Sequence, residues 1–451
     1  MEELREALQK IRENPAQDAG FTEESIRLRC RELERRLLAD ALQRQADRVA
    51  VTCPKCGDVP LTDRWRQKSR PLRTLSGPMC VTRTGGYCKK CDAFWYPADA
   101  RLGLSGGSTA SPLLREISAL LVSKMPAEQA EEISQRVCGI RLNHASLARD
   151  ARRQGDRAIE MLPGLQARAA WTTQKPLQGE VEPKPFTLVL QIDAWNIRER
   201  DHWNETEAMR ASDPSFSRWH WVYVATVFRL DQRCVTGQPG KHRAVITERS
   251  HVATREGIET MTRQLHGEAV RRGLATAERV LIIADGAVWI WNAGKDRFPN
   301  AVQRLDLFHA NSYLWAVAHE LHGAGSAAAR QWVKPLLRQV REDRTPAVIT
   351  ELRELLPTLT EAQAKKVHTT VEYYTNNLHR MKYAEGERRH EPVGSGAIES
   401  TCRQLQCRMK RCGQFWTQPG DEALLTLGTF WRNGYWEKLF PHAELTSVSR
   451  N

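Results

Sequence analysis

The order of predicted strands and helices between residues 185 and 310 constrains the fold of this chain more than any other feature. Five apolar runs, rich in β-branched and aromatic residues and too short for helices, predict strands. The first three follow one another directly, and a helical pattern from Thr254 to Gly273 separates the third from the fourth. A helical connection leads to the fifth, so we expect an α/β domain around one mixed sheet. The five runs occupy residues 185–195, 219–231, 243–253, 279–289 and 303–310.

Three acidic residues lie where this arrangement would bring carboxylates together. The strand order is that of a ribonuclease H-like sheet, in which the first and fourth strands are neighbours, so Asp193 and Asp285 are expected at adjacent strand ends. Two converging carboxylates repel each other unless a cation lies between them. A helix that Ser395 can cap supplies Glu399 from its first turn. The pattern predicts a site for two Mg²⁺ or Mn²⁺ ions, the number that polynucleotidyl transfer uses.

Each of these acids also has an ordinary structural explanation. Aspartates at strand ends often cap turns, and Asp285 followed by Gly286 is a turn signal. A glutamate in a first helical turn complements the helix dipole, and Arg403 lies four residues after Glu399, where the two can form an ion pair. Spacing alone leaves the metal site and these structural roles open.

Three motifs resemble those of a known enzyme family. The run from Tyr373 to Trp416 closely resembles the carboxy-terminal motif of IS-Kra-type insertion-sequence transposases, which belong to the DDE transposases near the Mutator-like group. DGAVWIWN, which begins at Asp285, resembles their second-aspartate motif, and Asp306 to His309 matches their D-x-x-H element. QIDAW matches their first-aspartate strand, although alanine follows the aspartate where the family more often has glycine.

The resemblance covers residues 186–435 and implies a DNA transposase with a ribonuclease H-like core and a helical insertion. Such an enzyme binds the terminal inverted repeats of an insertion sequence and catalyses metal-dependent strand cleavage and transfer into target DNA. The family's catalytic metal ligands correspond to Asp193, Asp285 and Glu399, with Asp306 and His309 as accessory residues.

Two other functions remain open at this point. The chain could be a domesticated DNA-binding protein without catalysis, although the presence of all three acids argues against this. It could also be a metal-dependent nuclease that cuts DNA without strand transfer. An assay that joins pre-cut ends to a plasmid separates the nuclease from the transposase.

Two CxxC pairs predict one structural Zn²⁺ site. Cys53 and Cys56 form the first pair, Cys88 and Cys91 form the second, and each pair can direct two thiolates at one tetrahedral ion. The alternating segments between the pairs suit the short strands of a zinc ribbon. Cys80 is an additional thiol in the same region and the one most able to compete with this ligand set.

Basic residues ahead of the predicted sheet suit contacts with DNA. Some lie between the cysteine pairs, and others lie on the last of three short helices predicted within residues 111–154, where Gly139 marks a sharp turn. That arrangement fits a helix-turn-helix. Solvated surface charge and simple helix packing explain the same residues about equally well. The candidate DNA-contacting residues are Arg64, Arg66, Lys68, Arg149, Arg152 and Arg153.

The charge balance favours a polyanionic partner. Lys and Arg number 67 against 54 Asp and Glu, which gives a net charge of +13. We expect double-stranded DNA, bound by a homodimer, and no membrane partner, because the chain has no apolar run of membrane-spanning length. The charged amino terminus has no export segment, so we expect a cytoplasmic, nucleoid-associated protein whose 11 cysteines stay reduced.

The predicted domain organisation follows from these patterns and from a Pro-rich polar stretch that reads as a linker. The segments are an N-terminal helical region (1–50), a zinc ribbon (51–104), a helix-turn-helix-like DNA-binding domain (105–171), the linker (172–185), the catalytic core (186–310), a helical insertion (311–390) and the C-terminal part of the core with the Glu399 helix (391–451).

Overall fold

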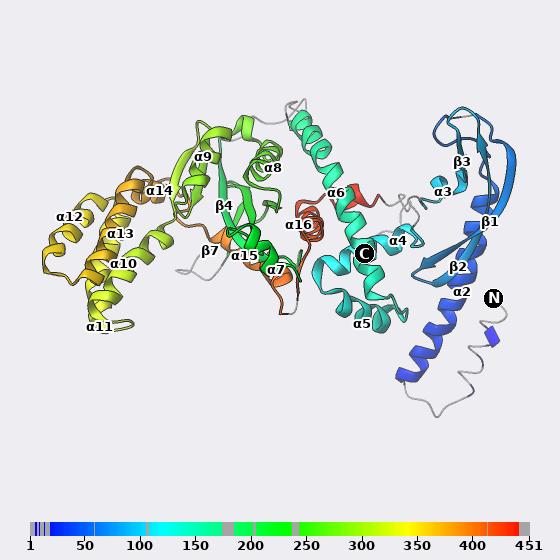
Figure 1. Cartoon of the computed structure of the whole chain (residues 1–451), viewed down its shortest axis with the longest axis horizontal. Helices are drawn as coiled ribbons and strands as arrows, with labels where there is room; N and C mark the ends of the chain where they lie inside the picture. The colour runs from blue at the N-terminus through cyan, green and yellow to red at the C-terminus, as the bar shows by residue number, and fades with distance from the viewer. Residues whose placement is uncertain are drawn as a thin grey trace. The chain divides into compact units, whose positions relative to one another are not determined.

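The protein forms two compact units, Met1–Gly155 with Phe440–Asn451, and Asp156–Leu439 (Figure 1). The structure is a computed structural model. It describes residues 5, 6, 9, 13, 19–57, 59–104, 108–173, 185–201, 204–236, 243–412 and 414–441, without the side chains of residues 19–22, 63–66, 169–173, 235–236 and 243–244. Most of the predicted linker, residues 174–184, therefore lies outside the described residues.

The first unit contains a three-stranded antiparallel sheet in the order β1-β2-β3. Its strands are β1 (Thr62–Thr74), β2 (Gly77–Cys88) and β3 (Ala93–Trp95). The β1–β2 hairpin turns at Leu75 and Ser76, and Gly77 begins β2 with a φ of 115°, a conformation that glycine adopts readily. The long helix α2 (Ala19–Asp47) packs its apolar side chains against this hairpin, which gives the sheet one covered face.

Three helices complete the first unit and lead into the second. They are α4 (Pro112–Lys124), α5 (Ala127–Cys138) and α6 (His144–Thr173). Ser111 caps α4 by accepting the N–H of Leu114, and Gly139 ends α5 in the left-handed conformation with a φ of 60°. The predicted third short helix is instead a long one.

The second unit is built on a five-stranded mixed sheet in the order β10-β9-β4-β5-β8. β4 is parallel to β9 and β9 to β10, whereas β4–β5 and β5–β8 are antiparallel. The prediction of an α/β domain with a mixed five-stranded sheet is confirmed. The strands are β4 (Thr187–Arg198), β5 (Trp219–Arg229), β8 (Ser250–Thr254), β9 (Arg279–Ala284) and β10 (Val302–Leu305).

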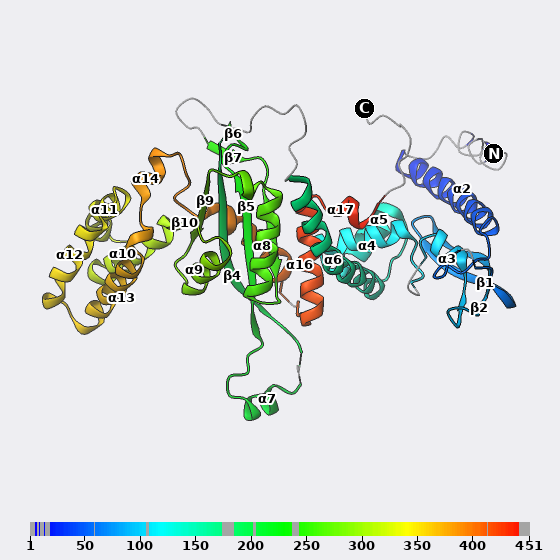
Figure 2. The ribbon, with the colours of Figure 1, turned by 90° about the horizontal axis from the view of Figure 1, so that it is seen from above.

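Helices cover both faces of this sheet because the central strands are apolar on both sides. Leu188 and Leu190 of β4 share a core with α8 (Ile258–Arg271) and α9 (Val288–Arg297). The opposite face packs against α15 (Gly396–Met409), and Figure 2 shows α8 running alongside the strands. The helix predicted to carry Glu399 therefore lies on the sheet itself.

Several of the predicted strands were wrong in extent, and two of them affect the candidate site residues or the sheet order. The run at 243–253 divides into β7 (Arg243–Ile246), which pairs only with β6 (Arg233–Thr236), and β8, which alone joins the main sheet. The polar stretch Thr247–Glu248–Arg249 interrupts it. The fifth strand ends one residue before Asp306, so this aspartate lies at a helix N-terminus and not inside a strand.

The first strand is longer than predicted. We expected it to end at Asp193, but β4 continues to Arg198 because β5 supplies hydrogen-bonding partners as far as the pair Arg198↔Trp219. Asp193 therefore lies within a strand, at the point where the neighbouring strand β9 has already ended.

A group of helices gathers at one end of the second unit, between β10 and α15 in the sequence (Figures 1 and 2). These are α10 (Leu307–His322), α11 (Ala327–Arg341), α12 (Thr345–Leu355), α13 (Glu361–Asn377) and α14 (Tyr383–Arg388), with the 3₁₀ turns η2 (Leu356–Thr358) and η3 (Leu378–Arg380). The remaining described elements are α3 (Pro97–Arg101), α7 (Thr206–Ser212), η1 (Leu274–Thr276), α16 (Gln418–Asn433) and α17 (Trp436–Leu439).

Candidate functional site

Asp193 lies on β4, and Asp285 directly follows the neighbouring parallel strand β9. The register between β4 and β9 ends at the pair Gln191↔Ile283. Two further residues along each strand lead to Asp193 and to Asp285, so the two aspartates are level with each other. Parallel strands that end together present their following residues at the same edge of a sheet, which is the edge that usually carries binding sites.

The negative charges of Asp285 and Glu399 act on the carboxyl group of Asp193. Burial raises the pKa of Asp193, and the negative charges of Asp285 and Glu399 raise it further. Hydrogen bonds from the backbone N–H of Ala194, at 2.7 Å, and from Sγ of Cys402, at 3.4 Å, oppose this rise. A cation between the carboxylates would remove the repulsion and lower the pKa of Asp193.

The oxygens of the three carboxylates are not gathered as closely as the four cysteine sulfurs described below. Across the described residues, the one group of three or more candidate ligands whose donor atoms all lie within 4.8 Å of one another is formed by cysteines. Asp193, Asp285 and Glu399 are therefore spread more widely than that. Their oxygens are hard donors of the kind that Mg²⁺ and Mn²⁺ prefer.

Gln191 attaches the Glu399 helix to the sheet. Its side chain is buried on β4, two residues before Asp193. Its Nε2 donates to the carbonyl of Gly394 at 3.1 Å, and its Oε1 accepts the N–H of Ile398 at 2.9 Å. Because one side chain satisfies a donor and an acceptor at the start of α15, it sets the position of Glu399 relative to Asp193.

Asp306 joins two helix N-termini. Its Oδ1 accepts the N–H of His309 at 2.5 Å, which caps α10, and its Oδ2 accepts the N–H of Ser395 just ahead of α15. The Ser395 hydroxyl in turn donates to Glu399 at 3.2 Å. Asp306 is buried with both oxygens engaged, so it is placed to position Glu399 and not to bind a metal ion itself.

Two stacked tyrosines hold the loop that carries Asp285. The Tyr373 hydroxyl donates to the carbonyl of Asp285 at 2.6 Å, and its ring stacks on Tyr313 with the centroids 3.9 Å apart. The ring of His309 lies 5.8 Å from that of Tyr313. Gly286 has a φ of 100°, and a Cβ there would lie 2.8 Å from the Tyr373 hydroxyl. Glycine is therefore needed at this position.

The sequence patterns did not single out three of these residues. Gln191 had a visible signal, since a polar side chain in an otherwise apolar strand needs a buried partner. Tyr373 is the first residue of the motif that resembles the transposase family, but nothing local assigned its contact. Cys402 was not among the candidate site residues.

The four predicted cysteine ligands converge. The sulfurs of Cys53 and Cys91 lie 3.6 Å apart and those of Cys56 and Cys88 lie 4.0 Å apart. Tetrahedral Zn²⁺ with Zn–S bonds of about 2.3 Å requires sulfurs about 3.8 Å apart, so the cluster has the dimensions of a zinc site. The indole N–H of Trp95 donates to Sγ of Cys91 at 3.2 Å, which adds an outer hydrogen bond.

The first cysteine pair has the local geometry of a metal-binding knuckle. Burial of Cys53 opposes ionisation, but backbone N–H groups of Cys56 and Lys55 donate to its sulfur, and the pKa of this thiol is lowered to about 7. Cys80 is exposed and lies outside the four-cysteine cluster. The ligand set predicted from spacing is therefore the one that the fold brings together.

We expect the Cys88→Ser variant to lose zinc and to unfold at a lower temperature, because three thiolates bind zinc more weakly and this binding contributes to folding. Cys80→Ser is the matched control and should retain one zinc per chain. Metal analysis of the purified chains and thermal unfolding with and without a chelator measure both effects. Full zinc content in Cys88→Ser would show that the cluster is not a zinc site.

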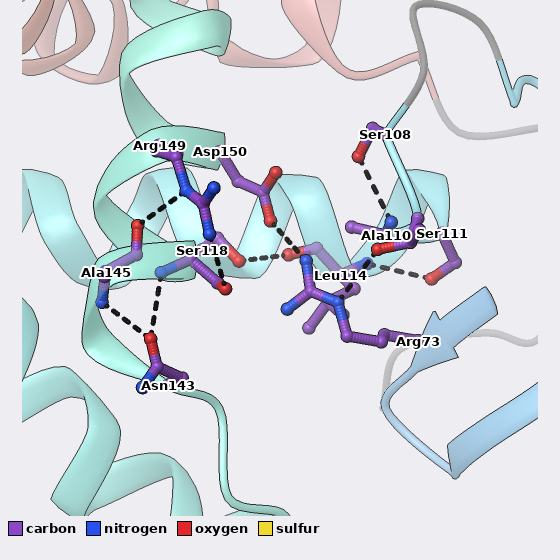
Figure 3. Close-up of polar contacts among 12 residues, drawn as sticks. Arg73, Ser108, Ala110, Ser111, Leu114, Ser118, Asn143, Ala145, Arg149 and Asp150 are labelled. Carbon is purple, nitrogen blue, oxygen red and sulfur yellow. Dashed lines mark hydrogen bonds and ion pairs between the residues drawn. The ribbon is translucent and has the colours of Figure 1, made fainter. Parts of the chain in front are cut away.

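Two of the three basic candidates of α6, Arg149 and Arg153, line a small polar cavity, and Figure 3 shows Arg149 near Asp150. Arg73, at the end of β1, donates to Thr109 at 3.1 Å and pairs with Asp150 at 3.2 Å. Arg149 folds back onto the carbonyl of Ala145 at 3.3 Å. The cavity, of about 180 Å³, is lined by Arg73, Ser108, Thr109, Ser146, Arg149, Asp150 and Arg153.

The other basic candidates are not gathered at that cavity. Arg152 is exposed on the same helix, and Lys68 is exposed on β1 opposite Arg83. The side chains of Arg64 and Arg66 lie outside the described residues, although both positions belong to β1. The structure thus brings two of the six candidates together.

Comparison with known proteins adds no identification. No protein-family model matches the sequence, and no curated protein matches it either. Among the helices in the described ranges, we find none with the length and apolar composition needed to span a bilayer.

Proposed function

We propose that this chain is a DDE-type DNA transposase in which Asp193, Asp285 and Glu399 hold two divalent metal ions. The observation that carries the proposal is the arrangement of these acids: one on β4, one directly after the parallel strand β9, and one on a helix anchored to β4 through Gln191. The sheet order β10-β9-β4-β5-β8, in which β5 is antiparallel to both of its neighbours, is the order we expect of a ribonuclease H-like sheet and supports the proposal.

We infer two ions and not one from the chemistry of polynucleotidyl transfer. Ions about 3.5–4 Å apart need acids distributed around both, with one acid shared between them. In this proposal Asp193 and Asp285, which lie level in the strand register, share one ion, and Glu399 holds one of the two. When bound, the ions would activate the attacking oxygen and stabilise the leaving oxygen. The protein orients these acids through Gln191 and Asp306.

The first unit supports a role in binding double-stranded DNA, including terminal inverted repeats. Arg149 and Arg153 line a cavity that also carries serine and threonine hydroxyls, a combination that suits a backbone phosphate. The four-cysteine cluster and its three-stranded sheet belong to the same unit, and Lys68 of β1 is exposed there. We propose that a homodimer uses this unit to deliver DNA ends to the carboxylate site.

The decisive experiment measures strand joining. Purified chain, Mg²⁺, pre-cut element ends and a supercoiled plasmid should yield plasmid molecules with covalently joined ends. Cleavage of the ends without joining would favour a metal-dependent nuclease. Binding of the ends with neither cleavage nor joining, in Mg²⁺ or Mn²⁺, would favour a DNA-binding protein that has lost catalysis.

A further inference from the structure

Two arginines at the end of α8 lie against the first residue of β8. Arg271 donates to the buried hydroxyl of Ser250 at 2.8 Å, and Arg272 donates to the same hydroxyl at 2.9 Å. Each of them also pairs with a carboxylate. Arg271 pairs with Glu268 at 2.8 Å, and Arg272 pairs with Glu248 at 2.7 Å. The charges of these two guanidinium groups are therefore balanced.

Two further arginines approach the start of β8 from other segments. Asn433, at the end of α16, exchanges hydrogen bonds of 2.8 Å with the backbone N–H and carbonyl of His251, the second residue of β8. Arg432 directly precedes Asn433, and Arg249 lies two residues before His251. Both arginines are partly buried.

The buried imidazole of His251 shows that these arginines converge. Its pKa is lowered to about 3, first by burial and then by the positive charges of Arg249, Arg432 and Arg272. The ring is therefore neutral at pH 7, and its Nδ1 lies 3.3 Å from the hydroxyl of Thr401 on α15. We call the four residues the arginine cluster: Arg249, Arg271, Arg272 and Arg432.

Two members of the arginine cluster have no counter-charge. Within the described ranges, neither Arg249 nor Arg432 pairs with a carboxylate. Burial lowers the pKa of both guanidinium groups, and the charge of Arg249 lowers that of Arg432 further. Arg432 donates to the carbonyl of Gly428 at 3.0 Å, and the C-terminus of α16 offsets part of its charge. Arg249 lies outside the helices and strands and has no such compensation.

This charge balance suits a phosphate group. The four guanidinium groups face the carboxylates of Glu248 and Glu268, which leaves an excess of two positive charges. The planar fork of an arginine matches the oxygens of a phosphate group, and hydrogen bonds between charged groups are stronger where water is partly excluded. An anion between Arg249 and Arg432 would also remove the repulsion between them.

The arginine cluster lies close to the carboxylate site on the sheet. Gln191 of β4 is level with Thr226 of β5, and Thr226 is level with His251 of β8. Since neighbouring strands are about 4.8 Å apart, His251 and Gln191 are separated by about 10 Å. Asp193 lies two residues after Gln191. Duplex DNA carries one phosphate per about 1.7 Å of its axis, so a duplex at the carboxylate site has several phosphates within such a distance.

We propose that Arg249 and Arg432 form an anion site that binds a phosphate group, and that this group is a backbone phosphate of DNA held at the carboxylate site. The first part depends only on the arginine cluster. The second part rests on the proposed function, because it takes DNA as the substrate.

The first test measures binding of inorganic phosphate. Thermal unfolding of the full-length chain is followed in sodium phosphate and in sodium chloride at equal ionic strength and pH, without divalent metal. Phosphate should raise the unfolding temperature by about 2–4 °C, because an anion that binds only the folded chain stabilises it. Arg249→Gln and Arg432→Gln should each lose more than half of this rise. In chloride, Arg249→Gln should unfold at or above the temperature of the unaltered chain, because the repulsion is gone.

Three control variants accompany this measurement. Arg338 is exposed and already pairs with Glu342 at 2.7 Å, so Arg338→Gln should leave the phosphate response unchanged. Arg149→Gln alters the cavity at α6, and the loss caused by Arg249→Gln should be the same in its presence. Arg249→Lys keeps the charge without the planar fork and should retain part of the response.

The second test identifies the source of the phosphate group. Binding of a labelled blunt DNA duplex is measured by fluorescence anisotropy at several salt concentrations. The Arg249→Gln/Arg432→Gln double variant should bind the duplex about tenfold more weakly at low salt, the scale of one lost charge-assisted contact. The slope of log affinity against log salt concentration should fall in magnitude by about one, as expected for one lost phosphate contact.

The outcomes separate the two parts of the proposal. No rise in phosphate beyond chloride, or an equal rise in the unaltered chain and in both variants, would overturn the anion site. A lost phosphate response with unchanged duplex binding would assign the site to a free phosphate compound and overturn its role with DNA. If the unaltered chain binds no duplex, the proposed function fails, whereas the phosphate measurement still decides the anion site.

Discussion

Glu399→Gln should reduce metal-dependent cleavage of end DNA by at least about a hundredfold, the scale of loss when one charge-stabilising group is removed from an active site. Glutamine keeps the shape of the side chain and can still accept the hydrogen bond from Ser395, so α15 should stay in place. What it removes is the negative charge that a divalent ion requires. Cleavage and joining are measured on the same end substrates, with Mg²⁺ and with Mn²⁺.

The matched control is Glu361→Gln. Glu361 is also a glutamate in the first turn of a helix, α13, and it is exposed. If Glu399 only complements its helix dipole, the two variants should lose a similar small amount of stability. Both should then keep the full cleavage activity. Cleavage by Glu399→Gln at the rate of the unaltered chain would show that the catalytic assignment is wrong.

Glu391→Gln should lower the free energy of unfolding by about 3–5 kcal/mol, because it leaves a buried guanidinium without its counter-charge. Arg304 and Glu391 each have a side chain 1% exposed, and their ion pair measures 2.8 Å. Arg304 also donates to the carbonyl of Pro392 at 3.1 Å. The pair therefore fixes the segment that leads into α15. Urea unfolding followed by tryptophan fluorescence gives the free energy.

Glu385→Gln provides the comparison for that measurement. Glu385 pairs with Arg279 at 3.4 Å, and Arg279 also pairs with Glu391, but the side chain of Glu385 is 39% exposed. Exposed ion pairs contribute less than about 1 kcal/mol. Equal losses in the two variants would mean that burial does not set the strength of the Arg304 pair.

The long-range contacts around Glu399 explain why the candidate site could be predicted only in part. Local patterns indicated that Asp193 and Asp285 follow apolar strands and that Glu399 opens a helix. They could not indicate that Gln191 binds the start of that helix, since the two residues of the Gln191–Ile398 hydrogen bond are 207 positions apart. They also misplaced Asp306, whose capping role depends on where β10 ends.

The sequence by itself determined the features that depend on residues close together in the chain, namely the cysteine cluster and the order of strands and helices. The CxxC spacing places two thiolates within one tight turn, so Cys53, Cys56, Cys88 and Cys91 could be named as one cluster before any fold was known. Periodicity likewise indicated the order of strands and helices, because burial of one face repeats every two or 3.6 residues.

Only the tertiary structure decided which strand edges find partners and which side chains meet across the sheet. β4 runs past Asp193 to Arg198 because β5 pairs with it, and the run at 243–253 divides because only β8 reaches the main sheet. These outcomes depend on hydrogen bonds between residues far apart in the chain, whose formation no local pattern records. The same pairing carries Trp219 and Trp221 out along an extension of the sheet, where they are exposed.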